Sequence, residues 1–377
     1  MKTIGIYLSL NLILFLSGCT SENPDENENS FPVTNNSLVD PGATAETVAL
    51  YGNLQQLASE GVMFGHQDDL AYGIGWWAEP GRSDIKDVCG DYPAVYGWDL
   101  GDIQNEDNLD GVNFSKMIDW IREAYDRGGI ITISMHLDNP VTGENAWDNT
   151  EAVSKILPGK SHHMKYLATL DMIADFLEDL KTSTGTYIPV ILRPYHEHNH
   201  TWSWWGAESC TAEEYNALWK MTVEYLRDDR EVHHLLYVIS PQEIESTDDY
   251  LKRYPGDDYV DILGLDYYKL WDISSVTDLG KTLATVATLA EQRGKVSALT
   301  EVGIENVPIS DWWTNYLLEG INYNDQSKKT AWALVWRNAS KDHHFAPYPG
   351  HASEEDFLNF FSDPFTVFEN DLPDMYE

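Results

Sequence analysis

Basic residues are scarce in this chain of 377 residues, which has 24 Lys and Arg against 62 Asp and Glu and a formal net charge of −38. So strong a negative charge repels the phosphates of nucleic acids and of anionic membranes, and it argues against both as direct partners. A neutral ligand is compatible with it, and polysaccharides are one such class. Aromatic residues are abundant, with 14 Trp, 21 Tyr and 11 Phe, as either a carbohydrate-binding cleft or a large aromatic core would require.

Cysteine is also scarce, with three in the whole chain. The sequence leaves open whether Cys89 and Cys210 are free thiols or form one disulfide. Neither lies in a spacing typical of metal sites, and the histidines that occur as adjacent pairs would point apart on a strand. We therefore expect neither a metal ion nor an organic cofactor.

The first residues have the pattern of a targeting segment. Lys2 precedes an apolar stretch, and Leu16-Ser17-Gly18-Cys19 looks like a bacterial lipobox. This predicts a lipoprotein signal peptide over residues 1–18 and a lipid anchor on Cys19, with an ordinary cleaved signal peptide as the alternative. Residues 19–40 are expected to form an acidic, disordered tether. Their acidity resembles the surface-export signal of Bacteroides-type lipoproteins, so the predicted location is the outer membrane, facing the cell surface, with the periplasmic side as the alternative.

Eight segments have the composition of buried strands, and each is followed by helix-compatible sequence. The strand segments are Gly61–Gln67, Ala94–Leu100, Ile130–Leu137, Ile188–His196, His234–Pro241, Asp261–Tyr268, Val296–Val302 and Ala333–Arg337. Apolar residues have helical spacing in Phe114–Arg127, Met164–Leu180, Ala212–Leu226, Val276–Arg293 and Asp356–Phe361, and Thr44 is a candidate N-cap for a first helix. This alternation predicts an α/β fold, a single (β/α)8 TIM barrel over residues 41–377. An open doubly wound sheet is the alternative, but the Gly-rich phosphate loop that usually follows its first strand is missing.

Polar and aromatic residues collect at the carboxyl ends of these strand segments, where the active sites of such barrels lie. The ends carry Phe64-Gly65-His66-Gln67, Tyr96-Gly97-Trp98-Asp99, Ser134 to Pro140, Arg193 to Gly206, Asp266-Tyr267-Tyr268, Thr300-Glu301 and Trp336-Arg337-Asn338. One polar strand end would mean little, but nearly all of them together predict a cleft.

Two of these ends deliver a glutamate, Glu197 and Glu301. Glu197 precedes three tryptophans, and apolar walls raise the pKa of a carboxyl as a general acid requires. The pair predicts glycoside hydrolysis with Glu197 as acid/base and Glu301 as nucleophile; carboxyls about 5–5.5 Å apart would mean retention, and about 6.5–9.5 Å inversion. The alternative is an aromatic cluster at the end of a barrel, with Glu197 paired to Arg193.

Neighbouring side chains are assigned from their positions in the strands. Arg193 and Tyr268 are expected to point into the barrel mouth and to hold Glu301 ionised, and Asp266 shares a face with Tyr268. His136 could contact sugar hydroxyls or the acid, or be satisfied by backbone alone. Alternation places His196 on the face opposite Glu197, which predicts a supporting role.

Three kinds of residue remain around the predicted cleft. Trp202 and Trp336 are candidate sugar platforms, whereas Trp204 and Trp205 could equally be packing. Arg337, at the end of a buried strand, needs either the substrate or a cleft carboxylate as partner. The two aspartates Asp99 and Asp138 are interpreted as ion-pair or turn residues and receive no role.

Arg-Pro-x-His-Glu-x-Asn at 193–199, followed by Trp-x-Trp-Trp-Gly at 202–206, resembles the acid/base segment of glycoside hydrolase family 26, which contains many β-1,4-mannanases. Supporting motifs stand at 64–67, 134–140, 264–268, 300–303 and 336–338, so the resemblance spans residues 40 to 365. It implies the same barrel, a retaining mechanism with Glu197 as proton donor and Glu301 as nucleophile, and β-mannan or galactomannan as the partner. It also implies that the sugar subsites are lined by His136, His196, Trp202, Tyr268, Trp336 and Arg337.

Two residues depart from the family pattern. His200 stands where Gly often follows the Asn, and Met135 stands where Trp often precedes the histidine of the third strand. Both leave the chemistry intact and bear on the sugar subsites. Mixed-linkage β-glucan and β-1,3-xylan are alternative substrates within the family, and a non-catalytic glycan-binding lipoprotein is the alternative outside it.

Overall fold

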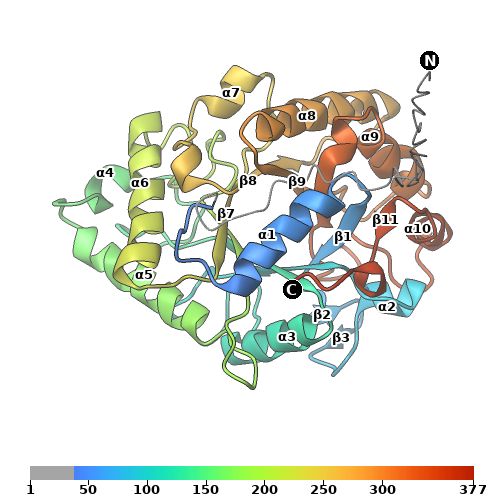
Figure 1. Ribbon diagram of the computed structural model, residues 1–377, viewed down its shortest axis with the longest axis horizontal. Coiled ribbons are helices and arrows are strands. Elements are labelled where there is room, and N and C mark those ends of the chain that lie inside the picture. Colours follow the sequence, from blue (N-terminus) through green and yellow to red (C-terminus); the bar gives the residue numbers. More distant parts are fainter. Residues whose placement is uncertain (1–37) are drawn as a thin grey trace, which may run out of the picture. The chain divides into compact units, whose positions relative to one another are not determined.

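The computed structural model describes residues 38–377. Eight parallel strands form a closed barrel (Figure 1), because each pairs with the next in the chain and the last pairs with the first. They are β1 (Val62–Gln67), β4 (Val95–Asp99), β5 (Ile130–Met135), β6 (Val190–Pro194), β7 (Leu235–Ile239), β8 (Ile262–Tyr267), β9 (Val296–Val302) and β10 (Thr330–Val335). The predicted (β/α)8 barrel and its eight strand segments are confirmed. The predicted signal peptide, Cys19 and most of the tether lie outside the described residues.

Helices lie around the strands in Figure 1. They are α1 (Ala45–Leu57), α2 (Asp84–Cys89), α3 (Phe114–Asp126), α4 (Val153–Ile156), α5 (His163–Glu178), α6 (Ala212–Glu224), α7 (Thr247–Leu251), α8 (Ile273–Glu291), α9 (Glu319–Ile321) and α10 (Glu354–Phe361). The remaining strands are short. A hairpin is formed by β2 (Tyr72–Gly73) and β3 (Trp76–Trp77), and β11 (Thr366–Val367) pairs with β1. Thr44 caps α1 as predicted, since its hydroxyl accepts the amide of Thr47 at 3.3 Å.

The first helix closes the amino-terminal end of the barrel. Leu50 and Leu54 of α1 belong to the same apolar cluster as the strand residues Ile191, Val238 and Trp332. With this end filled by packed side chains, the carboxyl ends of the strands are left to form a cleft.

Cys89 and Cys210 are free thiols, which settles the question that the sequence left open. Among residues 38–377, every helix is too short or too polar to cross a lipid bilayer.

Candidate active site

Three carboxylates converge at the carboxyl end of the barrel. One oxygen each of Glu197, Asp266 and Glu301 lies within 4.8 Å of the others. Asp266 and Glu301 are buried at the ends of β8 and β9, and Glu197 is half-buried just after β6. A register shift after Leu265 sets Asp266 directly opposite Glu301. Like charges this close repel in a site of low dielectric, so the group requires a cation, a shared proton or both.

Arg193 supplies the cation. Its Nη1 donates to Asp266 Oδ2 at 2.8 Å and its Nη2 donates to Glu301 Oε1. Tyr268 donates its hydroxyl to the other oxygen of Glu301 at 2.7 Å. Burial, followed by the charge of Glu301, raises the pKa of Tyr268, so its proton stays available for donation. Both donors that the sequence predicted for Glu301 are therefore in contact with it.

Glu197 holds its proton more tightly than an exposed glutamate does. Burial raises its pKa well above the usual range, and the charges of Glu301 and Asp266 raise it further. Arg193 and a hydrogen bond with Trp202 oppose this shift without cancelling it. The cleft therefore places a carboxyl that keeps its proton to higher pH, Glu197, next to Glu301, whose oxygens accept from two donors.

This raised pKa makes the folded protein less stable at neutral pH. Above about pH 4.3, the ordinary pKa of a glutamate, the folded state keeps the Glu197 proton that the unfolded state releases, so stability falls as pH rises towards the raised pKa. Glu197→Gln removes this term, and we expect its Tm to exceed that of the wild type by a few degrees at pH 7 and by less at pH 4. Thermal melts at both pH values check this, with the exposed Glu208→Gln as control. A Tm equal to or below that of the wild type at pH 7 would contradict it.

The loop after β6 breaks the alternation of the strand. Tyr195 and Glu197 have φ angles of +49° and +53°, in the left-handed region that non-glycine residues rarely occupy. Tyr195 is buried and bonds the hydroxyl of Thr222 on α6 at 2.7 Å. His196 turns towards the cleft, with its Nε2 3.9 Å from Glu301 Oε1. The alternation-based placement of His196 on the face opposite Glu197 is therefore wrong, because the strand ends at Pro194.

His136 is held by an aspartate that received no role from the sequence. Its Nδ1 lies 2.7 Å from Asp99 Oδ2, and its Nε2 lies 3.1 Å from His196 Nε2. Burial lowers the pKa of His136, but Asp99 outweighs this and the net shift is upward. Burial, Arg193 and His136 lower the pKa of His196 well below its usual range. A protonated His136 that donates to a neutral His196 satisfies both shifts.

Asp99 could have been found in the sequence. It ends the strand next to the one that delivers His136, and carboxyl ends of neighbouring parallel strands lie side by side. Its carboxylate also accepts the hydroxyl of Ser134 at 2.5 Å and the amide of Gly101 at 2.6 Å. Asp138, the other aspartate that received no role, accepts a hydrogen bond from Gln104 at the exposed surface, at 2.7 Å.

Indole rings line the cleft at several points. Trp202 is 37% exposed and stacks on His200 with the ring centroids 4.1 Å apart. Trp336 meets the His136 ring edge-on at 6.0 Å. Trp147, which the sequence did not single out, is 51% exposed and stacks on His136 at 5.4 Å. Exposed indole faces beside the carboxylates are suitable platforms for sugar rings.

Trp204 and Trp205 are packing residues. Both are buried, and they donate their indole N–H groups to the carbonyls of Leu137 and His196, each at 2.8 Å. They thereby fix the left-handed turn around Glu197 against the neighbouring strand end.

Arg337 has carboxylate and phenol partners within the chain. Its Nη2 pairs with Asp110 at 2.8 Å, and its Nη1 donates to the hydroxyl of Tyr72 at 3.1 Å. Tyr72 in turn donates to Asp68 at 2.5 Å. Burial, followed by the charge of Asp110, raises the pKa of Asp68 well above the usual range. The sequence predicted a partner for Arg337 but did not identify Asp110, which lies in the irregular segment between β4 and α3.

Comparisons with known proteins agree with this geometry. The sequence model described as Glycosyl hydrolase family 26 matches residues 39–341. A mannan endo-1,4-beta-mannosidase of Bifidobacterium adolescentis is 35% identical over 349 residues, which are 86% of this chain and 34% of that protein. The chain thus spans about a third of the length of that relative. A Bacillus subtilis protein with the same description is 29% identical, and the match covers 88% of this chain and 88% of that protein.

Solved structures extend this likeness to the fold. A GH26 beta-mannanase from Bacteroides ovatus has a TM-score of 0.85 and 43% identity, over 89% of this chain and 98% of that chain. A modular endo-beta-1,4-mannanase from Cellulomonas fimi has a TM-score of 0.86 and 37% identity, over 90% of this chain and 79% of that chain.

Proposed function

Because the chain belongs to glycosyl hydrolase family 26, we propose that it hydrolyses internal β-1,4-mannosidic bonds of mannan and galactomannan with retention of configuration. The observation that carries this is the approach of Glu197 and Glu301, whose nearest oxygens lie within 4.8 Å. Retaining enzymes hold their two carboxyls about 5–5.5 Å apart, whereas inverting ones need about 6.5–9.5 Å to admit a water. The relatives described as mannan endo-1,4-beta-mannosidases support the choice of substrate.

In the first step Glu301 attacks the anomeric carbon while Glu197 gives its proton to the departing glycosidic oxygen. The C–O bond of the chain breaks and a glycosyl ester of Glu301 forms. In the second step Glu197, now a carboxylate, takes a proton from water, whose oxygen attacks the same carbon and releases Glu301. One water is consumed, and Glu197 is protonated again.

The remaining side chains have supporting roles in this proposal. Arg193 and Tyr268 bind both oxygens of Glu301, so they orient it for attack and stabilise it as a leaving carboxylate; Asp266 holds Arg193 in place. The hydrogen bonds from Asp99 to His136 and from His136 to His196 hold the two imidazole rings in place beside the cleft. The sugar-binding residues are Trp202 and Trp336 as stacking platforms and Arg337 as a hydrogen-bond donor.

Product analysis tests this function directly. Residues 20–377 are incubated with linear mannan, galactomannan, mixed-linkage β-glucan and β-1,3-xylan, and we expect a ladder of manno-oligosaccharides of the β-anomer. A single short product would indicate cleavage from a chain end. Products from β-glucan or β-1,3-xylan alone would replace the substrate. Binding to mannan without products would leave a glycan-binding lipoprotein.

The raised pKa of Glu197 should appear in the pH dependence of the rate. Since the first step needs protonated Glu197, kcat/KM is expected to stay high through the pH range in which an ordinary carboxylic acid is ionised, and to fall only as pH passes the raised pKa. The measurement is kcat/KM on a manno-oligosaccharide against pH. In Glu197→Gln we expect this fall of kcat/KM at alkaline pH to disappear. If the fall is unchanged in the variant, it reports the titration of another group.

For its location, we propose that the mature chain is anchored in the outer membrane through lipidated Cys19 and faces the cell surface. The lipobox at 16–19 and the acidic stretch after it support this. Mass spectrometry of the amino-terminal peptide would detect the diacylglyceryl group, and protease treatment of whole cells would report the exposed side. An unmodified Cys19 would contradict the anchor.

A further inference from the structure

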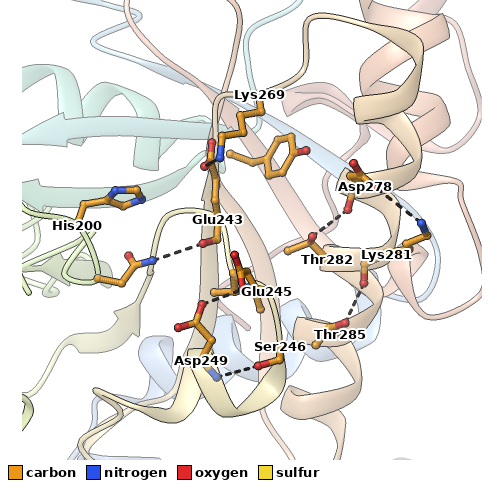
Figure 2. A pocket seen from close by; sticks show the side chains of 13 residues that line it. His200, Glu243, Glu245, Ser246, Asp249, Lys269, Asp278, Lys281, Thr282 and Thr285 are labelled. Carbon is orange, nitrogen blue, oxygen red and sulfur yellow. Dashed lines mark hydrogen bonds and ion pairs between the residues drawn. The ribbon is translucent and has the colours of Figure 1, made fainter.

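A hollow of about 730 Å³ opens beside the loop at 195–206, the Glu197 loop. Its volume lies within the range of about 300–1,000 Å³ that is typical of ligand sites. Its walls come from the Glu197 loop, from the segment between β7 and α7, from the end of β8 and from α8 (Figure 2). In Figure 2, His200 lies on one side, Thr282 and Thr285 of α8 lie on the other, and Glu243 and Glu245 lie between them. The three catalytic-site carboxylates are not among its lining residues.

The hollow adjoins the Glu197 loop, on the acid side of the cleft. Asn199 and His200 line it, and the His200 ring stacks face to face on Trp202, with an angle of 16° between the planes. Trp202 in turn hydrogen-bonds Glu197. Since Glu301 attacks the anomeric carbon and Glu197 protonates the departing oxygen, the leaving part of the chain lies on the Glu197 side. The hollow therefore lies one side chain beyond Trp202, on the same side of the scissile bond as the leaving part of the chain.

Several polar groups in the hollow are already occupied and serve as structure. Asn199 donates to the carbonyl of Gln242 at 2.6 Å and accepts its amide at 2.9 Å, which ties the Glu197 loop to the segment after β7. Thr282 and Thr285 donate to carbonyls of their own helix at 2.8 and 2.9 Å.

Other side chains of the hollow are only partly engaged by the protein itself. Nε2 of His200 is buried and has no hydrogen-bond partner among residues 38–377. Glu243 has a φ of +47°, a strained conformation of the kind found at ligand clamps, and its carboxylate pairs with the half-exposed Lys269. The hollow holds four carboxylates, Glu243, Glu245, Asp249 and Asp278, against two lysines. An anionic ligand is repelled by this balance, whereas a neutral ligand with many hydroxyl donors matches its acceptors.

We infer that this hollow binds the leaving-chain mannosyl residue that follows the one on Trp202, with His200, Glu243 and Lys269 as its hydrogen-bonding residues. The inference rests on the proposed function and deepens it, because it assigns a further subsite on one side of the scissile bond. It also gives a role to His200, the bulky residue that stands where the family often has Gly. A mannosyl unit held there makes cleavage favour positions at least two residues from the reducing end.

The test compares two substrates that differ only beyond Trp202. Mannohexaose fills the hollow, whereas nitrophenyl β-mannotrioside places its aryl group on Trp202 and leaves the hollow empty. For Lys269→Ala and for His200→Gly we expect kcat/KM on mannohexaose to fall about fivefold to tenfold and kcat/KM on the aryl substrate to change less than about twofold. Lys165→Ala removes an exposed lysine of α5, outside the hollow, and serves as the matched control. The bonds cleaved in mannohexaose should also move towards the reducing end in both hollow variants.

Five outcomes would overturn the inference. If kcat/KM of the hollow variants falls equally on both substrates, Lys269 and His200 support the site as a whole and not one sugar. If kcat/KM on both substrates stays at the wild-type value, the hollow binds no sugar. A loss confined to galactomannan would assign the hollow to a galactosyl branch. A rise in Tm with CaCl2 that Asp249→Asn abolishes would make it a cation site. Inactivity of the wild-type chain on both substrates would overturn the proposed function, and the inference with it.

Discussion

Glu197→Gln is expected to lower kcat on mannan by about 10²–10⁴-fold, the usual contribution of a positioned general acid. An amide of the same shape keeps the contacts of the loop but neither donates a proton to the departing oxygen nor accepts one from water. Steady-state rates on linear mannan measure the loss. Titration calorimetry should show that the variant binds manno-oligosaccharides about as tightly as the wild type does. The substitution removes a proton transfer and not a sugar contact.

The same variant separates the two chemical steps. A nitrophenyl leaving group departs without protonation, so the first step on nitrophenyl β-mannotrioside should remain fast while the second, which needs a base, becomes slow. We expect a burst of one nitrophenolate per enzyme, and azide, which needs no base, should restore turnover and yield a glycosyl azide of retained configuration. Glu301→Gln is the control, with no burst and no rescue by azide. A Glu197→Gln variant with wild-type turnover of mannan would falsify the assignment of the acid/base residue.

The barrel was predictable because the composition of its strands indicates that they are buried. Runs such as Val190-Ile191-Leu192 leave no polar residue for a solvated face, and eight of them separated by helical spacing admit few other topologies. The two glutamates followed from the same reasoning, since each ends such a run. The contacts of Arg193 and Tyr268 with Glu301 followed from period-2 alternation within regular strands.

The position of His196 was not predictable in this way, because period-2 alternation holds only while the chain is extended. Tyr195 and Glu197 adopt left-handed conformations that non-glycine residues rarely take, and no local sequence rule marks them. Buried tryptophans after the turn hold the strained backbone in place. The same limit applies to the hollow beside His200, where Glu243 is also left-handed and the walls come from separate segments of the chain.

Arg193→Ala is expected to be the most destabilising single change in the cleft. Arg193 is 3% exposed and is the cation in contact with both Asp266 and Glu301, which are buried as well. Its removal leaves those carboxylates uncompensated at close range, and breaking a buried pair in this way costs about 3–5 kcal/mol, or roughly 5–10 °C in Tm. Activity on mannan should fall at the same time, since Glu301 loses a donor that orients it.

The pH dependence of this loss identifies its cause. Burial raises the pKa of Asp266 to about 7 even though the charge of Arg193 opposes the shift. Without Arg193 this pKa rises further, so the folded protein keeps a proton that the unfolded one releases above about pH 4, and it loses stability as pH rises. The Tm deficit of Arg193→Ala should therefore be larger at pH 7 than at pH 4. Arg193→Lys keeps the charge but cannot donate to both carboxylates as the guanidinium does. Its Tm should therefore lie between those of Arg193→Ala and the wild type.

Arg230→Ala is the matched control for burial. Arg230 makes three ion pairs, with Asp171, Asp175 and Glu178, at 2.8, 2.5 and 3.1 Å, but the partner side chains are 39–69% exposed. Exposed pairs contribute about 0–1 kcal/mol each and are screened by salt. We expect a small Tm change that shrinks further in salt, whereas the deficit of Arg193→Ala should persist. Equal losses in the two variants would mean that the number of ion pairs, and not the burial of the carboxylates around Arg193, sets the stability of the cleft.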